Sequence, residues 1–238
     1  AMFHFEEGEV FLIDKPIDWT SFDVVNLIRA VIKRYHGIRK LKVGHAGTLD
    51  PLATGLLILC TGRMTKQIDN FQAQEKTYTG TMLLGQTTPT FDLESEPDNY
   101  FPTDNITIEM MEEARKLFIG DIMQRPPKYS AIKIQGKRAF DYARSDEEIA
   151  LKERAIHIDD FILDYTDFPK INFEVKCSKG TYIRSLVHDF GKVLNNGACL
   201  ISLRRTKIGD FSVDDARDLE EFKKELMESG SEHKDDMT

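Results

Sequence analysis

The segment Val43-Gly44-His45-Ala46-Gly47-Thr48-Leu49-Asp50-Pro51-Leu52-Ala53-Thr54-Gly55 carries most of the information in this chain. It places one carboxylate, Asp50, at the end of a glycine-rich loop and directly before an apolar stretch. The Asp-Pro pair predicts the N-cap and first residue of a short helical turn, because proline fixes φ there and lacks an N–H that such a turn leaves unbonded. The glycines permit tight bends and a close approach by another molecule. The rest of the chain decides whether Asp50 is structural or catalytic.

The composition is that of a soluble globular protein: 238 residues, 41% of them hydrophobic and 30% charged. No apolar run approaches the roughly 20 residues of a membrane span, and the N-terminus lacks the pattern of a signal peptide. We therefore expect a cytoplasmic protein with no membrane partner. Cys60, Cys177 and Cys199 have no CxxC spacing and sit among apolar neighbours, which favours buried thiols over disulfides or metal ligands.

Charge is distributed unevenly along the chain. The net charge is −8, but residues 212–238 hold ten acids and four bases and so contribute −6 of it. Three stretches are basic and free of acids, namely 24–49, 122–140 and 190–209. This separation of charge predicts a surface that binds a polyanion, although the chain as a whole is acidic.

The periodicity of apolar residues predicts an α+β protein. Strands are expected at 9–14, 56–60, 76–84, 129–134, 154–164, 171–177 and 200–206. Helices are expected at 22–35, 63–71, 107–118, 139–144, 182–194 and 219–226, with a long exposed loop at 85–105. We expect one domain over residues 1–211. An acidic tail, 212–238, is expected to form one short helix and then to be disordered.

Six blocks of sequence occur in an order that resembles the bacterial tRNA pseudouridine-55 synthases, the TruB family. They are Asp14-Lys15-Pro16, the Gly44–Gly55 loop, Lys76-x-Tyr78, Gln124-x-Pro126-Pro127-x-Tyr129-Ser130-Ala131, Cys177–Arg184 and Leu203-Arg204-Arg205. The resemblance runs from about residue 8 to residue 215. It implies the pseudouridine-synthase fold, a single catalytic domain with a central mixed, largely antiparallel sheet flanked by helices and loops.

The resemblance implies that the chain isomerises a uridine in the TΨC loop of tRNA, at position 55, to pseudouridine. The N1–C1′ bond breaks, the base turns, and C5 joins C1′, with no cofactor and no metal. Asp50 matches the nucleophilic aspartate of the family, and a carboxylate suits this role because it is ionised at neutral pH. Attack at C1′, attack at C6 and a glycal route all stay open.

Other matched residues surround that reaction. Arg184 corresponds to the arginine that pairs with the aspartate, and Tyr78 to the tyrosine that packs on the base. His45 corresponds to the histidine at the site where the uridine is flipped out of its stack. The remaining matched positions are substrate-binding: Tyr182 and Leu203 line the pocket, and Lys15 lies near it. The basic block 122–140 belongs, by the same likeness, to an insertion that grips the tRNA arm.

Two departures from the family pattern stand out. Asp18 replaces the usual glycine after Lys-Pro-x, and Asp is one of the few residues that tolerate a positive φ there. After Phe211 only the acidic tail follows, which is too short for the PUA domain of many relatives. We therefore expect a short form that binds the TΨC arm of tRNA as a monomer, without a guide RNA or an obligatory protein partner.

Two other functions compete with this one. An RNA chaperone would remodel tRNA without turnover, and a tRNA-folding role could also accompany the enzyme activity. A guide-RNA-dependent synthase, as in archaea and eukaryotes, relies on a PUA domain and on partner proteins, which makes it the weaker alternative.

The variant Asp50→Asn separates an enzyme from a pure binding module. It keeps the size of the side chain but removes the nucleophilic charge, so turnover should vanish while tRNA binding survives. Single-turnover assays and filter binding with an unmodified tRNA transcript measure both. Turnover equal to that of the wild type would contradict a nucleophilic role for Asp50.

Overall fold

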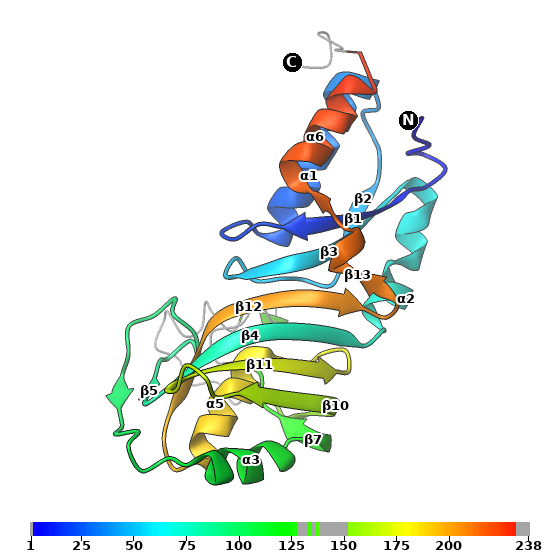
Figure 1. The fold of residues 1–238 in the computed structure, drawn as a ribbon. Helices are drawn as coiled ribbons and strands as arrows, with labels where there is room; N and C mark the ends of the chain where they lie inside the picture. The colour runs from blue at the N-terminus through cyan, green and yellow to red at the C-terminus, as the bar shows by residue number, and fades with distance from the viewer. Residues whose placement is uncertain (1, 128–132, 135–136, 139–151, 232–238) are drawn as a thin grey trace. The chain divides into compact units, whose positions relative to one another are not determined.

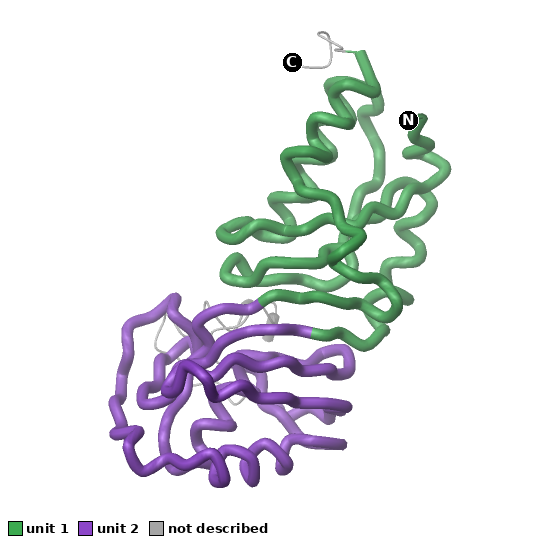
Figure 2. Tube along the Cα trace, viewed as in Figure 1, with its two compact units in different colours: residues 1–77, 204–238 green, residues 78–203 purple. Residues whose placement is uncertain are grey.

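The computed structural model describes residues 2–127, 133–134, 137–138 and 152–231 (Figure 1). The chain forms two compact units (Figure 2). Unit 1 contains residues 1–77 and 204–238, and unit 2 contains residues 78–203. The boundary falls within two strands, β4 (Lys76–Leu84) and β12 (Ala198–Ile208). Each unit has its own apolar core.

Unit 1 is built on a mixed sheet with the strand order β14-β1-β3-β12, in which β2 also pairs with β3 and β13 with β12. Strands β1 and β14 are parallel, whereas the pairs β1–β3, β2–β3 and β12–β13 are antiparallel. The strand bounds are β1 Val10–Lys15, β2 Val43–Ala46, β3 Ala53–Thr61, β13 Phe211–Ser212 and β14 Arg217–Asp218. The helices are α1 Ser21–His36, η1 Gly62–Gln67, α2 Ile68–Gln72, η2 Val213–Asp215 and α6 Leu219–Glu228.

Helix α1 begins and ends as its sequence predicts. The Thr20 hydroxyl accepts a hydrogen bond from the Asp23 N–H, and the Asp23 carboxylate accepts one from the Thr20 N–H, which completes a capping box. Gly37 ends the helix in the left-handed conformation with φ 70°. The buried face of α1 includes Val24, Ile28 and Ile32 and belongs to the main core of unit 1.

Helix α6 is part of that same core. Leu219, Phe222 and Leu226 are buried, with at most 2% of their surface exposed, and α6 packs against α1. The rings of Phe222 and Phe11 lie 4.7 Å apart between centroids. The sequence predicted this helix, and its inward face makes it a structural element of unit 1 although it belongs to the acidic end of the chain.

Unit 2 has the strand order β12-β4-β11-β10-β7. Strand β10 is antiparallel to both β11 and β7. The strands are β7 Gly120–Gln124, β10 Arg154–Asp164 and β11 Lys170–Cys177, with the short pairs β5 Gln86–Thr87 and β6 Asn99–Tyr100, and β8 Lys133–Ile134 and β9 Lys137–Arg138. The helices are α3 Ile108–Lys116 and α5 Ile183–Val193.

Aromatic rings hold the core of unit 2 together. The Phe161 ring lies 6.0–6.5 Å from the rings of Phe118, Phe173 and Phe190, mostly edge to face. These rings come from β10, β11, α5 and the residues after α3. They therefore tie both helices to the sheet.

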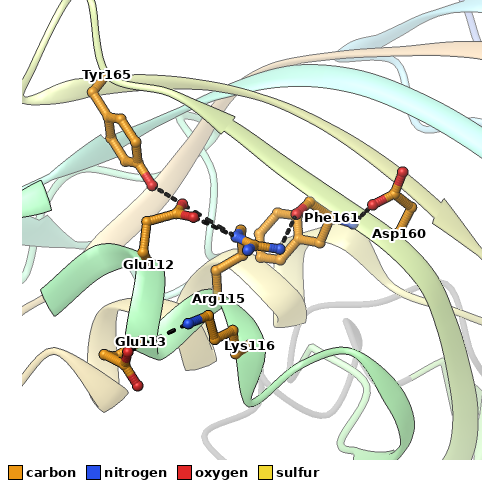
Figure 3. Close-up of polar contacts among 7 residues, drawn as sticks. All are labelled: Glu112, Glu113, Arg115, Lys116, Asp160, Phe161 and Tyr165. Carbon is orange, nitrogen blue, oxygen red and sulfur yellow. Dashed lines mark hydrogen bonds and ion pairs between the residues drawn. The ribbon is translucent and has the colours of Figure 1, made fainter. Parts of the chain in front are cut away.

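A polar network fastens α3 to β10 (Figure 3). Arg115 donates from Nη1 to the Phe161 carbonyl at 3.0 Å and from Nε to the Glu112 carboxylate at 3.1 Å. The Tyr165 hydroxyl donates to the same carboxylate. The hydrogen bond from Tyr165 is the main cause of the lowered pKa of Glu112, and Arg115 contributes less. Burial, and after it the bond to Glu112, raise the pKa of Tyr165.

The structure confirms most expected elements and corrects some. Residues 50–53 form a single turn, which the Ala53 N–H closes on the Asp50 carbonyl, and the turn leads straight into β3. The turn expected at Asp50-Pro51 is therefore present, but β3 begins three residues earlier than the strand expected at 56–60. The segment 85–105 contains β5 and β6 and several buried polar residues, so it is not an exposed loop throughout. Strand β7 was not expected. Much of 129–134, the turn at 135–136 and the helix at 139–144 lie outside the described residues.

The three cysteines are free and buried, as predicted. Within the described ranges, no helix is long and apolar enough to cross a membrane.

The variant Phe222→Ala tests whether α6 is structural. Removing a fully buried phenylalanine should lower the free energy of unfolding by about 3–5 kcal/mol. Phe22→Ala is the matched control, because Phe22 is 63% exposed on α1 and should change little. Urea unfolding followed by fluorescence measures both. Equal small effects would mean that α6 adds nothing to the core.

Candidate active site

The turn that carries Asp50 is fixed by hydrogen bonds from its own backbone and from α1. The Ala53 N–H donates to the Asp50 carbonyl at 2.9 Å, which closes the turn at the start of β3. The Ser21 hydroxyl, at the first residue of α1, accepts from the Leu49 N–H at 2.9 Å. Strand pairing places the following residues of β3 opposite β1. The half-buried carboxylate of Asp50 is thus attached to rigid elements.

Asp18 fastens the same turn from the other side. Its N–H donates to the Pro51 carbonyl at 2.8 Å, and its φ is 68°. This left-handed conformation explains why an aspartate can stand where the family usually has glycine, since Asp tolerates positive φ better than most residues.

Lys15 supplies a buried cation beside Asp50. Its side chain is fully buried, and Nζ donates to the Pro16 carbonyl at 2.8 Å and the Trp19 carbonyl at 2.5 Å. Burial lowers the pKa of Lys15 from 10.5 to about 8, and the Asp50 carboxylate is the strongest influence opposing this shift. The charges of Lys15 and Asp50 therefore interact within unit 1.

The buried side chain of Arg205 holds the loop that precedes Asp50 by hydrogen bonds. The side chain is 1% exposed; Nε donates to the Leu56 carbonyl at 2.9 Å and Nη2 to the Gly47 carbonyl at 3.0 Å. Gly47 has φ 91°, and a Cβ there would lie 3.2 Å from Nη1 of Arg205. Gly55 has φ 110°, and a Cβ there would lie 2.2 Å from the Arg205 carbonyl oxygen. Both glycines thus have a positive φ; a side chain at position 55 would collide with the backbone of β12, and one at position 47 would crowd the Arg205 guanidinium. The sequence alone assigned no role to Arg205.

His45 is held in its neutral form. Burial, and after it the charge of Arg205, lower the pKa of His45, while the backbone of Gly47 opposes the shift. Its Nδ1 is buried and has no hydrogen-bond partner among the described residues.

Arg204 connects two other matched blocks. Its guanidinium binds the Asp14 carboxylate through two hydrogen bonds, of 3.0 and 2.9 Å. This bidentate pair links β1 to β12 within unit 1.

In unit 2, Arg184 lies in the first turn of α5 and is 7% exposed. Its Nη1 is 3.4 Å from the Thr90 carbonyl oxygen and 3.8 Å from Oδ2 of Asp92. Asp92 is 1% exposed, and its Oδ1 accepts from the Thr90 hydroxyl at 2.6 Å. These partners come from the 85–105 segment, which the sequence analysis treated as an exposed loop.

The start of α5 is attached to the end of β7. The Gln124 side chain accepts from the Tyr182 N–H at 2.8 Å and donates to the Tyr182 carbonyl at 3.0 Å. The Ser185 hydroxyl donates to the Arg125 carbonyl at 2.6 Å. These contacts give a structural reason for the Gln124 block, because they orient the turn that carries Tyr182 and Arg184.

The matched site residues divide between the two units. Lys15, His45 and Asp50 belong to unit 1, where Lys15 interacts with Asp50 and Arg205, and His45 with Arg205. Four belong to unit 2: Tyr78 on β4, Tyr182 and Arg184 at the start of α5, and Leu203 on β12. Tyr78 is buried, whereas Tyr182 and Leu203 are half-buried. Among the described residues, no group of three or more His, Cys, Asp or Glu could hold a metal ion.

The fold is that of the pseudouridine synthases. The chain matches a structure described as a Cbf5-Nop10-Gar1 complex with a TM-score of 0.70 and 27% identity, over 93% of this chain and 55% of that chain. It matches an archaeal box H/ACA sRNP Nop10-Cbf5 complex with a TM-score of 0.64 and 25% identity, over 94% and 54%. The chain thus spans about half the length of these structural relatives. The α+β prediction, with a mixed and largely antiparallel sheet, is confirmed.

Sequence comparison identifies the family. The TruB family pseudouridylate synthase N-terminal domain matches residues 33–183, and the tRNA pseudouridylate synthase B C-terminal domain matches residues 184–237. A tRNA pseudouridine synthase B from Phocaeicola vulgatus is 53% identical over 92% of this chain and 93% of its own length. One from Bacteroides thetaiotaomicron is 48% identical over 98% and 99%. The chain belongs to the TruB family of pseudouridylate synthases, and these enzymes are isomerases.

The lowered pKa of Lys15 predicts a pH dependence of stability. The folded protein releases this proton near pH 8 and the unfolded chain near 10.5, so the unfolded state binds more protons in between. The free energy of unfolding of the wild type should therefore rise with pH, relative to Lys15→Met, from about pH 8 to about 10.5. Urea unfolding of both proteins at pH 7, 9 and 10 measures the difference. A difference that is constant with pH would contradict the shift.

Proposed function

We propose that the chain converts the uridine at position 55, in the TΨC loop of tRNA, to pseudouridine. The observation that carries the proposal is the likeness of nearly the whole chain to relatives named tRNA pseudouridine synthase B, at 48–53% identity. The sequence blocks support it as well, because Lys15, the Gly44–Gly55 loop, Gln124 and Arg205 make contacts that hold elements carrying matched site residues.

Asp50 is the proposed nucleophile. The N1–C1′ bond of the uridine breaks, the base turns within the pocket, and the C5–C1′ bond forms, while one proton leaves C5 and one is gained at N1. The rigid turn supports this role, since a carboxylate on a fixed backbone is aimed at the sugar without reorganisation. Two buried cations support it as well: Lys15 interacts with the carboxylate, and Arg205 holds the loop that precedes it. The same placement serves attack at C1′, attack at C6 and a glycal route.

We further propose that Arg184 pairs with Asp50 during the reaction. The support is the match of both residues to the family pattern and the burial of the guanidinium, which strengthens any ion pair it makes. In this proposal Tyr78 packs on the base, and Tyr182 and Leu203 line the pocket.

His45 is proposed to occupy the space that the flipped uridine leaves. Its neutral ring can stack between bases without a desolvation penalty for charge. Flipping costs a few kcal/mol, and stacking on aromatic side chains returns about 1–3 kcal/mol per base. The exchange is therefore close to balanced, and no external energy source is required.

The chain is proposed to act in the cytoplasm, as a monomer, on tRNA alone, without a guide RNA or an obligatory protein partner. One structural relative is described as a Cbf5-Nop10-Gar1 complex and another as an archaeal box H/ACA sRNP complex, whereas the sequence relatives are named tRNA pseudouridine synthase B. Identity is much higher to the second group, which supports stand-alone action. A tRNA-folding role is proposed as an accompaniment; the Asp50→Asn variant, which should still bind tRNA, is the form in which to measure it.

Incubation of the purified chain with an unmodified tRNA transcript tests the function. Chemical mapping should find pseudouridine at position 55 without added protein or RNA, and a transcript with cytidine at that position should give none. Product only after addition of a guide RNA or a partner protein would overturn stand-alone action.

Arg184→Lys tests the proposed pair. Lysine keeps the charge but loses the planar fork, so kcat should fall by about a hundredfold. Arg154→Lys is the matched control, because Arg154 is exposed on β10, and it should leave kcat unchanged. Single-turnover rates at saturating tRNA measure both. If Arg184→Lys reacts as fast as Arg154→Lys, Arg184 does not support the chemistry.

A further inference from the structure

Unit 1 contains a hollow apart from the turn that carries Asp50. It has a volume of about 650 Å³ and lies where the loop after α1 meets η1. Its lining, which we call the basic pocket, consists of Glu6, residues 37–42, Gly62, Arg63, Thr65 and Lys66.

The basic pocket concentrates positive charge. Five of its lining residues are cations with exposed side chains: Arg39, Lys40, Lys42, Arg63 and Lys66. Glu6 is the one acid in the lining. A gathering of this kind in a chain of net charge −8 creates a local field that attracts polyanions.

The backbone around the pocket is fixed, although the cationic side chains reach into solvent. The Gly62 N–H donates to the Lys42 carbonyl at 2.9 Å, and the Arg63 N–H donates to the Glu6 carbonyl at 3.2 Å. Gly37, in the left-handed conformation, turns the chain out of α1 into the pocket wall. The cations are thus presented from two segments that are held together.

The pocket lies far from Asp50 along the sheet. Asp50 comes just before the first residue of β3, and Gly62 follows the last, Thr61. Nine strand residues span roughly 26 Å at about 3.3 Å per residue. Strand β2 runs beside β3 and brings Val43, next to Lys42, opposite Thr61 at that same far end. A ligand in the pocket therefore cannot be the nucleoside that meets Asp50.

We propose that the basic pocket binds the phosphodiester backbone of the substrate RNA at a point outside the loop that is modified. The inference rests on the proposed function for the identity of the RNA. Exposed cations that are spread over a pocket suit successive phosphates of one strand better than a single small anion. Each contact is weak, and the affinity for the strand comes from the counterions that all the contacts together release. The pocket would thus give affinity for whole tRNA beyond that of the reacting arm.

The test uses the double variant Arg63→Gln/Lys66→Gln, which removes two exposed charges of the pocket. The matched control is Lys116→Gln/Lys170→Gln, which removes two exposed charges from unit 2. Binding to full-length tRNA and to a hairpin of the TΨC loop with two base pairs, too short to reach the pocket, is measured over a range of salt concentrations. Tripolyphosphate serves as the small-anion probe.

The pocket variant should bind tRNA several-fold more weakly than the wild type, and the slope of log K against log salt should fall by about two. The control should bind tRNA like the wild type, and all three proteins should bind the hairpin alike. Unchanged tRNA affinity, an equal loss for the hairpin, or a loss confined to tripolyphosphate would each overturn the proposal. Binding is measured apart from turnover, so a wild type that binds tRNA but makes no pseudouridine would refute the proposed function and leave the pocket tested.

Discussion

The buried guanidinium of Arg205 sets the conditions for the rest of the site in unit 1. A charge that is 1% exposed must have its hydrogen bonds satisfied, and it takes two carbonyl oxygens, those of Gly47 and Leu56. One oxygen belongs to the loop before Asp50 and the other to the strand after it. The arginine therefore joins both sides of the turn, and a side chain at position 47, where φ is 91°, would crowd its guanidinium.

Electrostatics in this region follow from the same burial. Arg205 and Lys15 are two cations close to the loop, at positions where water is largely excluded. Burial, and after it the charge of Arg205, lower the pKa of His45 and so favour its neutral form. A charged imidazole there would add a third cation at close range. The loop thus has a buried lysine beside the Asp50 carboxylate and a neutral ring at His45.

Local patterns predicted the regular elements well, because their signals are short in range. Strands β4 and β10 have the expected bounds, and α1 carries a capping box that can be read from Thr20 and Asp23. The failures involve contacts distant in sequence. Strand β3 begins before the expected residue 56 because it pairs with β1 and β2, and the buried Asp92 lies 3.8 Å from Arg184, ninety-two positions later. Neither partner can be inferred from neighbouring residues.

The inward face of α6 has a practical meaning for work on this protein. If the chain were cut after residue 211, Phe11 and the apolar side of α1 would lose the rings and aliphatic groups that cover them. A fragment that contained only the segment with the six sequence blocks would expose apolar side chains to water and tend to self-associate. Helix α6, at the acidic end of the chain, therefore covers part of the apolar core, and a soluble preparation should include it.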